Sequence, residues 1–348
     1  MLPAHRFVGT CEALTWVHYP YGGARTGVTA NRGSLIIVQA TVGLPRSLLF
    51  HKYHVLWTSF FEALDVETVT SPPSNRAILA RGIELSVDET CVPVKMFLGH
   101  VDSLREKADY ILVPRIVTLA RDETACVKFL GAYDVARNSV PGIRLLEYNV
   151  DVKNRIYERP ELCRVGQTFE RSRRKVRRAY DEAKARQLEH DVELAGRQEL
   201  ALERDGLKVL VVGHPYNLYD ELLGKPIIDF LGAHGVDVLC SEFADTAKAR
   251  ALSRRVSRDI PWTYNKELLG SLELYRSRVD GVIFLVTFPC GPDSLMTELC
   301  MRRMKGTPAI MIVLDELQSE AGLKTRLESF VDLLAAGKGR ALGGGVVE

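Results

Sequence analysis

Hydrophobic positions along the chain alternate between short continuous runs and helical spacings. A continuous apolar run at 35–43 predicts a buried strand. The next segment predicts a helix, because apolar residues from Leu49 to Leu64 recur every three or four positions, as a face packed on a sheet requires. The same pattern predicts a strand at 66–71, a helix at 76–85 and a buried strand at 108–117 whose end is marked by Pro114. Strands and helices alternate, so residues 34–155 are predicted to form a first α/β domain.

The alternation is clearer in the second half of the chain. Four apolar runs predict strands separated by helical stretches, and they begin at Leu207, Val236, Gly281 and Pro308. This pattern is typical of a parallel, doubly wound sheet with right-handed crossovers, and it predicts a second α/β domain at 206–348. A single glycine, Gly213, follows the first of these strands, so the G-x-G-x-x-G fingerprint of nicotinamide enzymes is absent.

A charged segment separates the two predicted domains. Residues 156–205 become rich in charged side chains and good helix formers from Gln167 onward, which predicts one long helix or a helical pair. Six basic residues lie between Arg171 and Arg178 and suggest either an acidic partner or a solvated helix face, and we favour the solvated face. The expected fold is therefore α/β, with two Rossmann-like parallel-sheet domains joined by this segment.

Composition narrows the class of protein further. The 46 Lys and Arg residues nearly balance the 44 Asp and Glu residues, and the net charge of +2 gives no general attraction to nucleic acid. No run approaches the roughly 18 apolar residues that a bilayer span needs, and no secretory leader pattern begins the chain. The sequence predicts a cytoplasmic protein that binds neither nucleic acid nor membrane. Residues 1–33 show no sustained periodicity and form an N-terminal extension without an assigned function.

The cysteines are the main candidates for chemistry. They are seven in number and scattered, at positions 11, 91, 126, 163, 240, 290 and 300. No C-x-x-C occurs, which excludes the zinc ribbon and the bacterial ferredoxin pattern. Any metal site must therefore be assembled from segments that are distant in the sequence.

Three cysteines occur in turns that suit metal ligation. Cys290 follows a predicted strand and precedes a helix expected to begin at Asp293 or Ser294, where backbone N–H groups and the helix dipole favour a thiolate. Cys91 has a similar setting, and Cys126 lies in a loop beyond the strand that ends at Pro114.

The other cysteines have a plainer interpretation. Cys240 ends a buried strand and Cys300 lies on an apolar helical face, so both are expected to be small core residues. Cys11 and Cys163 have no supporting context. The sequence alone also allows an α/β ligand binder in which every cysteine is buried and inert.

Several segments together resemble one family. They are the stretch from GLPRSLLF to GHVDSL (43–104) and the blocks VVGHPYNLYD, FPCGPDS and DELQSEAGLKTRLESFVDLL. These blocks resemble the 2-hydroxyacyl-CoA dehydratase family, including its double-cubane branch, and the acyl-CoA dehydratase activase-related proteins. The likeness covers roughly residues 42 to 335.

The resemblance implies an iron–sulfur redox protein. It implies that Cys91, Cys126 and Cys290 hold a 4Fe-4S cluster, or a double-cubane cluster shared between subunits, in a homodimer or a heterodimer with a related subunit. It also implies single electrons supplied by a separate ATP-dependent iron–sulfur activator, for a reduction or for radical dehydration of an acyl-CoA substrate. The chain would then be a lyase or an ATP-dependent reductase component of anaerobic metabolism.

A non-catalytic alternative arises from the same resemblance. The sequence has no P-loop, and in long relatives this region is fused behind the activator's nucleotide-binding domain. The chain is then an accessory or interaction module of an acyl-CoA dehydratase activase.

Two histidines are the candidates for catalytic residues. His100 follows Gly99 and suits either a proton relay or a structural hydrogen bond, of which we favour the structural role. His214 lies at the end of a predicted strand, where crevice-lining residues belong.

Overall fold

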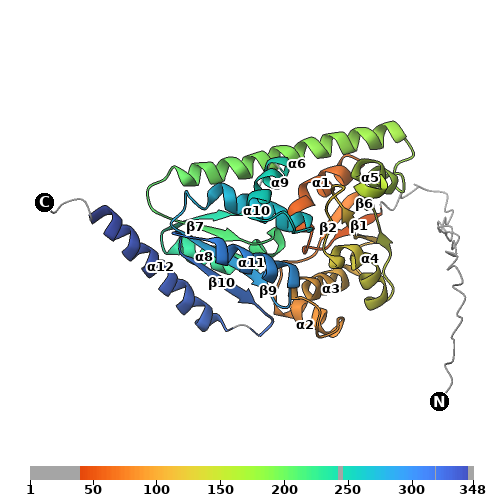
Figure 1. Cartoon of the computed structure of the whole chain (residues 1–348). Helices are drawn as coiled ribbons and strands as arrows, with labels where there is room; N and C mark the ends of the chain where they lie inside the picture. Colours follow the sequence, from red (N-terminus) through yellow and green to blue (C-terminus); the bar gives the residue numbers. More distant parts are fainter. Residues whose placement is uncertain (1–39, 242–245, 318, 344–348) are drawn as a thin grey trace, which may run out of the picture. The chain divides into compact units, whose positions relative to one another are not determined.

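The computed structural model describes residues 40–241, 246–317 and 319–343, which all belong to one compact unit. The predicted extension at 1–33 lies outside the described residues, as does most of the predicted strand at 35–43. Two four-stranded parallel sheets, each flanked by helices, confirm the predicted α/β fold class (Figure 1). The two sheet regions are called here the amino-terminal region (40–171) and the carboxy-terminal region (206–343).

The amino-terminal region is built on short parallel strands. Their order in the sheet is β2 (Glu67–Thr70), β1 (Thr41–Leu44), β3 (Tyr110–Leu112) and β5 (Leu145–Leu146). The prediction of a single strand at 108–117 is wrong. Pro114 lacks an N–H for the ladder, and beyond it β4 (Arg115–Thr118) pairs instead with β6 (Asn149–Asp151) in a separate two-stranded sheet.

Helices pack around this first sheet. They are α1 (Phe50–Glu62), α2 (Arg76–Glu84), α3 (Val92–Leu104), α4 (Val127–Ser139) and α5 (Glu158–Gly166), with a 3₁₀ turn at Val152–Asn154. The predicted apolar stripe of α1 is confirmed, because Leu56, Trp57, Phe60 and Phe61 are buried in the core. The side chain of Asn75 caps α2 by accepting hydrogen bonds from the next helical amides.

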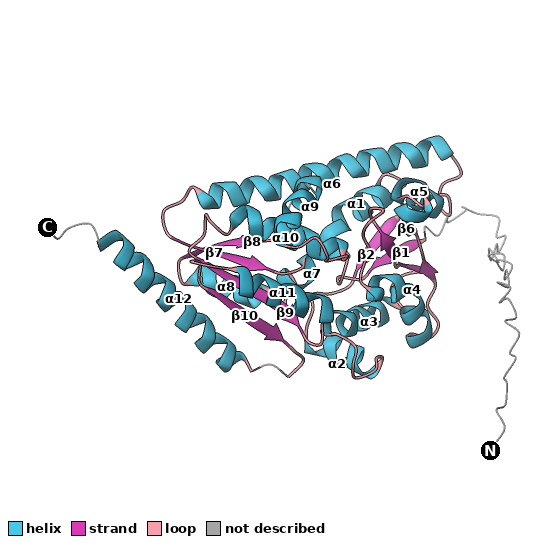
Figure 2. Cartoon of the chain, viewed as in Figure 1, coloured by secondary structure: helices cyan, strands magenta, loops and turns pink. Residues whose placement is uncertain are grey.

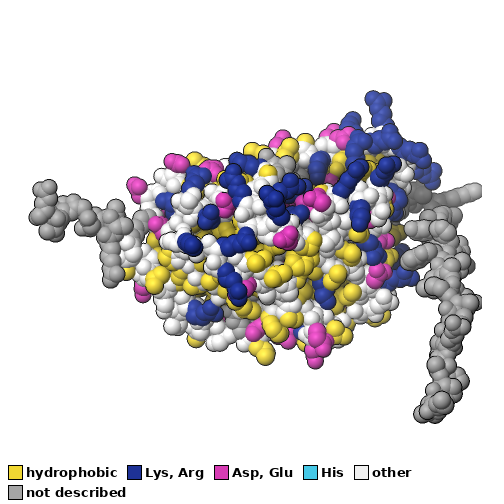
Figure 3. Space-filling model, in the orientation of Figure 1, with side chains coloured by type: hydrophobic (Ala, Val, Ile, Leu, Met, Phe, Trp, Pro, Cys, Tyr) yellow, Lys and Arg dark blue, Asp and Glu magenta, His cyan; other side chains and the backbone are white. Residues whose placement is uncertain are grey.

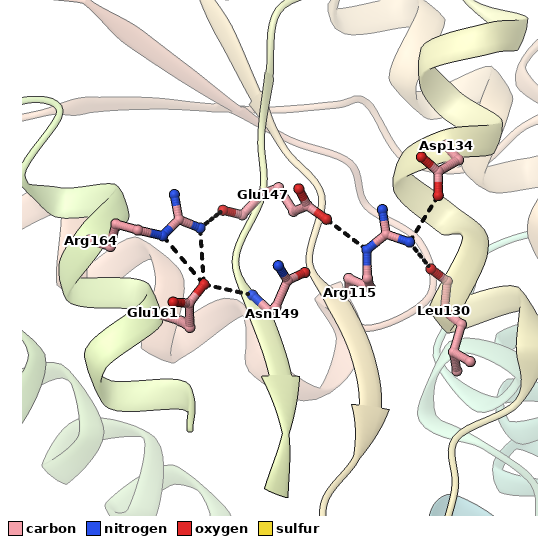
Figure 4. A network of polar contacts seen from close by, with 7 residues as sticks. All are labelled: Arg115, Leu130, Asp134, Glu147, Asn149, Glu161 and Arg164. Carbon is pink, nitrogen blue, oxygen red and sulfur yellow. Dashed lines mark hydrogen bonds and ion pairs between the residues drawn. The ribbon is translucent and has the colours of Figure 1, made fainter. Parts of the chain in front are cut away.

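Polar contacts hold α4 in place (Figure 4). The guanidinium of Arg115, on β4, donates to the Leu130 carbonyl at 2.7 Å, to the Asp134 carboxylate at 2.8 Å and to the Glu147 carboxylate at 2.6 Å. Arg164 donates to the Glu147 carbonyl at 2.8 Å, which extends the network to α5. Bonds of this charge-assisted kind have defined geometry, so they fix the position of α4 relative to β4.

A single long helix links the two regions. Most of the charged segment forms α6 (Arg173–Leu202). Of the two predicted alternatives, one long helix is therefore correct and a helical pair is not. The main packing contacts of α6 are with α1 and α5 of the amino-terminal region and with β8 of the carboxy-terminal region (Figure 1). Most of its side chains are exposed, and the buried ones are Val176, Ala179, Tyr180, Ala183 and Gln187.

The carboxy-terminal region has the predicted doubly wound sheet. Its strands are all parallel, in the order β10 (Ala309–Leu314), β9 (Gly281–Thr287), β7 (Leu207–Val212) and β8 (Val236–Cys240). One face packs against α8 (Lys225–Ala233) and α12 (Glu320–Gly343). The other packs against α9 (Thr246–Val256), α10 (Thr263–Tyr275) and α11 (Gly291–Arg303), and a short helix, α7 (Pro215–Leu218), follows β7 (Figure 2).

Helix α3 connects the cores of the two regions. Its Phe97 and Leu98 belong to the amino-terminal core, whereas Val92 and Met96 belong to a core cluster of the carboxy-terminal region. Helix α2 approaches α3 closely through glycine: a Cβ on Gly99 would lie 2.0 Å from the Ile78 carbonyl oxygen. The position of α3 therefore depends on both regions. Within the described part of the chain, no helix is long and apolar enough to cross a membrane.

Candidate functional site

The three candidate cysteines occupy the same local position in three different helices. Cys91 is the N-cap residue of α3, Cys126 that of α4 and Cys290 that of α11, and none of the side chains makes a capping hydrogen bond. The predicted helix start after Cys290 is corrected: α11 begins at Gly291, because the cysteine itself is the cap. Asp293 therefore lies in the first turn, and its carboxylate is free to contact other groups.

Backbone hydrogen bonds between the two regions hold the cysteine loops together. The Val92 amide, next to Cys91, donates to the Phe288 carbonyl in the Cys290 loop at 3.1 Å. The Thr124 amide, two residues before Cys126, donates to the Pro261 carbonyl at 2.9 Å, and the Thr124 carbonyl accepts from Thr263 at 3.0 Å. These bonds join segments far apart in the sequence, so the loop positions are fixed by the tertiary fold.

All three cysteines line one small cavity, of about 30 Å³, which we call the thiol pocket. Cys91 and Cys126 come from the amino-terminal region and Cys290 from the carboxy-terminal region. The other lining side chains are Leu48, Pro93, Val94, Lys128, Phe129, His214, Tyr216, Trp262, Tyr264, Asn265, Thr287, Pro292 and Asp293. The structure therefore brings the predicted cysteines together from both sheet regions.

Burial dominates the acidity of these thiols. It raises the pKa of Cys91, of Cys126 and of Cys290 above the ordinary value of a thiol. Each sulfur also faces a first-turn backbone amide, which lowers the pKa only in part. The amides at the helix N-termini favour the thiolate forms of Cys290 and Cys91, as expected, but in the free thiols the desolvation of a buried charge outweighs them.

A buried carboxylate organises one wall of the thiol pocket. Asp293 accepts hydrogen bonds from His214 Nε2 at 2.9 Å and from Asn265 Nδ2 at 2.8 Å. Burial alone would raise the pKa of Asp293, but these contacts outweigh it and hold the pKa below the usual value. The His214 ring also stacks on Tyr216, with ring centroids 5.0 Å apart. His214 is therefore held in one orientation beside the cysteines.

A larger cavity adjoins the thiol pocket. It measures about 330 Å³ and shares Leu48, His214, Tyr216 and Tyr264 with the smaller one. Its far wall is formed by α6, including Gln187. A cavity of this size accommodates a small molecule, in line with typical ligand pockets of roughly 300–1,000 Å³.

The thiol pocket offers three cysteine sulfurs as donors to a metal group. Among the described residues, no three His, Cys, Asp or Glu side chains converge closely enough to hold one ion. A cluster is bound through several metal atoms, so its cysteines need not converge on one point. Cysteine sulfurs are the donors that hold iron–sulfur clusters, and the Asp293 carboxylate lines the same cavity. If a cluster binds here, Cys91, Cys126 and Cys290 would hold it.

His100 lies in a separate buried cluster, called here the serine–histidine network. Its ring nitrogens Nδ1 and Nε2 lie 2.9 Å from the hydroxyl oxygens of Ser71 and Ser74, respectively. The Ser74 hydroxyl donates to the Asp220 carboxylate, and the Ser71 hydroxyl accepts from the Arg46 amide at 2.8 Å. Both nitrogens of His100 are therefore engaged, which favours the structural role expected for it.

The remaining cysteines lie apart from the thiol pocket. Cys300 is 1% exposed in the core, and burial raises its pKa to about 12. Cys163 is buried within α5, and Cys240 is half-buried at the end of β8. Cys11 lies outside the described residues.

Sequence inspection missed part of the site. Asp293 was expected only as a residue at the start of the helix, and Lys128 and Asn265 were not expected at the site. One signal could have identified Asp293 as a neighbour of Cys290. Asp293 lies three residues after Cys290, which is about one helical turn along the same face. Asn265 had no such signal, because it reaches the pocket from another helix.

Comparisons with known proteins place the chain in a family. No curated protein matches it. A solved structure of the SBP FpvC from P. aeruginosa in complex with a nickel ion aligns with 89% of this chain and 99% of its own, at 12% identity. The TM-score of 0.24 is too low to indicate a shared fold. The model of the CoA enzyme activase uncharacterised domain (DUF2229) matches residues 41–243, more than half of the chain. The chain therefore belongs to the CoA enzyme activase uncharacterised domain family.

Proposed function

We propose that this chain is an accessory module of a CoA enzyme activase system. The family match carries the proposal, because it covers the amino-terminal region, α6 and the first strands of the carboxy-terminal region. The sequence has no P-loop, and in this proposal ATP hydrolysis belongs to a separate activator. In this proposal the chain binds the activator and does not itself turn over an acyl-CoA.

Direct binding to an ATP-dependent iron–sulfur activator tests the accessory role. The full chain and the activator are mixed anaerobically, with ATP and with ADP, and analysed by size-exclusion chromatography with light scattering. We expect a defined complex, a changed rate of ATP hydrolysis and no dehydration of a 2-hydroxyacyl-CoA. Absence of a complex with either nucleotide contradicts the proposal, and so does dehydration by these two proteins alone.

A second candidate function is that of an iron–sulfur redox protein. It is supported by the convergence of Cys91, Cys126 and Cys290, three helix N-cap residues, on one pocket. In this proposal the three thiolates hold a 4Fe-4S cluster, or a double-cubane cluster shared with a second subunit. When bound, the group would supply one-electron redox chemistry. The imidazole ring of His214, which hydrogen-bonds to Asp293, would lie beside the cluster.

Metal analysis of cysteine variants tests this second candidate. Iron and sulfide per chain are measured after anaerobic reconstitution of wild type and of Cys91→Ala, Cys126→Ala and Cys290→Ala. The control is Cys300→Ala, which removes a buried cysteine outside the thiol pocket. We expect iron and sulfide to fall in the three pocket variants and to persist in the control. A wild type without iron and sulfide, or an equal loss in the control, contradicts the cluster.

A further inference from the structure

The start of α6 carries a group of basic side chains that the proposed function does not use. The α6 arginine cluster consists of Arg171, Arg173, Arg174, Arg177 and Arg178, all of which are exposed. Figure 3 shows Lys and Arg side chains gathered over the end of α6 that lies beside α5. This end is distant along the helix from Gln187, where α6 forms a wall of the larger cavity.

The cluster lies at the N-terminal end of α6, where positively charged side chains are unfavourable. Ser172 caps α6, and Arg173, Arg174 and Lys175 fill the first helical positions, with no acidic residue in the first turn. The helix macrodipole places partial positive charge at this end, so cations there are repelled and acidic side chains are preferred. The stability of α6 therefore does not explain why basic residues occupy these positions.

The protein itself neutralises little of this charge. Within the described part of the chain, Arg178 pairs with Glu182 at 3.3 Å, and Lys175 pairs with Asp65 and Glu170. The guanidinium groups of Arg171, Arg173, Arg174 and Arg177 form no ion pair with any described residue. Farther along α6 the pattern differs, because Lys184, Arg186 and Arg197 each have an acidic partner. The uncompensated charge is thus confined to the first turns.

We propose that the α6 arginine cluster is a docking surface for an acidic, carboxylate-rich surface of a partner protein. Residues 173 and 177, and likewise 174 and 178, are four apart and so share one helix face. The guanidinium is planar and binds a carboxylate through two parallel hydrogen bonds, a geometry that the arginine-dominated composition favours. The helix dipole adds to the attraction for anionic side chains.

The same stretch favours a protein partner over nucleic acid or a membrane. Residues 171–178 contain no aromatic side chain on which a base can stack. Their one apolar residue, Val176, is buried, so no apolar face is available to enter a bilayer. The inference goes beyond the proposed function and does not depend on it, because it concerns a surface remote from the thiol pocket.

A charge-reversal experiment on the full chain tests the docking surface. The probe is a fluorescein-labelled poly-L-glutamate peptide of about 15 residues, followed by fluorescence anisotropy from about 50 to about 400 mM salt. We expect the wild type to bind with an affinity that falls steeply with salt. The triple variant Arg173→Glu/Arg174→Glu/Arg177→Glu should bind about tenfold more weakly or worse.

The control variant has the same change in net charge. Arg254→Glu/Arg255→Glu/Arg258→Glu reverses three exposed arginines in and after the last turn of α9, and it should bind within about twofold of wild type. Thermal melting provides a second readout. The α6 variant should melt at or above the wild-type temperature, because it places acidic residues at a helix N-terminus. Lost binding then cannot be due to unfolding.

Defined outcomes overturn the proposal. Wild type that fails to bind the peptide at low salt, or equal losses in the α6 variant and the α9 control, shows that the cluster is not a specific site. Tighter binding of an oligothymidylate, or of phosphatidylglycerol vesicles, through the same arginines assigns the surface to another class of partner. A clearly lower melting temperature of the α6 variant shows that the arginines serve the fold.

Discussion

Two buried polar clusters, the thiol pocket and the serine–histidine network, join the same two sheet regions but differ in how completely their polar groups are bonded. In the network, both nitrogens of His100 and the hydroxyls of Ser71 and Ser74 have partners. In the thiol pocket, three cysteines face a cavity without capping hydrogen bonds. A fully bonded cluster stabilises the fold, whereas side chains that face a cavity are available for binding.

The largest expected effect comes from breaking the serine–histidine network. His100→Ala removes one hydrogen-bond partner from each of two buried hydroxyls, those of Ser71 and Ser74, and opens a cavity in a site where His100 is 0% exposed. We expect the free energy of unfolding to fall by about 3 kcal/mol, measured by urea denaturation. His234→Ala is the control, since His234 is exposed and its removal should cost less than about 0.5 kcal/mol. An equal loss of unfolding free energy in the two variants would contradict the structural role of the network.

A smaller change is expected at the helix that carries both clusters. Helix α3 holds Cys91 at its start and His100 near its end, and a Cβ on Gly99 would lie 2.0 Å from the Ile78 carbonyl oxygen. Gly99→Ala must therefore push α2 and α3 apart and lower the free energy of unfolding by about 2 kcal/mol. It should also alter the alkylation rate of the pocket cysteines, which His100→Ala leaves unchanged.

Gly196→Ala is the matched control for this substitution. Gly196 also lies within a helix, α6, but a Cβ there meets no atom within 4 Å. The substitution should stabilise the protein by about 0.5–1 kcal/mol through the higher helix propensity of alanine. If the two glycine variants change the free energy of unfolding and the alkylation rate alike, the close approach of α2 to α3 does not fix the position of the two clusters.

The sequence predicted the strands of the carboxy-terminal region because continuous apolar runs, bounded by turns, are a local signal. It did not predict β4 and β6, because their pairing joins residues more than thirty positions apart, for example Arg115 with Asn149. Pro114 was correctly seen as the end of a strand. The conformation of the chain after Pro114 depends on distant partners such as Glu147, which no local pattern reveals.

The site was predictable to a similar extent. Cys290 could be placed from sequence because it directly follows an apolar strand. The convergence of Cys91 with it depends on a backbone bond from Val92 to Phe288, which spacing cannot show. The roles of the two histidines were equally hidden: the partners of His100 lie 29 and 26 residues away, and the carboxylate that binds His214 lies 79 residues away.

The smallest expected effect is a change of stability with pH that arises from the serine–histidine network. Burial, the main cause, lowers the pKa of His100 to about 3, and the neighbouring His51 and Arg46 act in the same direction. The unfolded chain keeps the ordinary value near 6.5, so between these values the unfolded state binds a proton that the folded state does not. Stability from this group is therefore fully present above about pH 6.5 and is lost progressively as the pH falls toward 3.

Urea denaturation at two pH values measures this effect. From about pH 7.5 to about pH 5.5, His100 should lower the free energy of unfolding by about 1.4 kcal/mol. The pKa of half-buried His51 is lowered to about 4, chiefly by desolvation, and this adds a loss of the same sign. The informative quantity is therefore the difference between wild type and His100→Asn. Because asparagine does not titrate, the variant should lose about 1.4 kcal/mol less than wild type over this interval, although it starts less stable. If the variant shows the same pH dependence as wild type, His100 already carries a proton in the folded protein. The serine–histidine network would then not be a fully bonded, neutral cluster, and its contrast with the thiol pocket would fail.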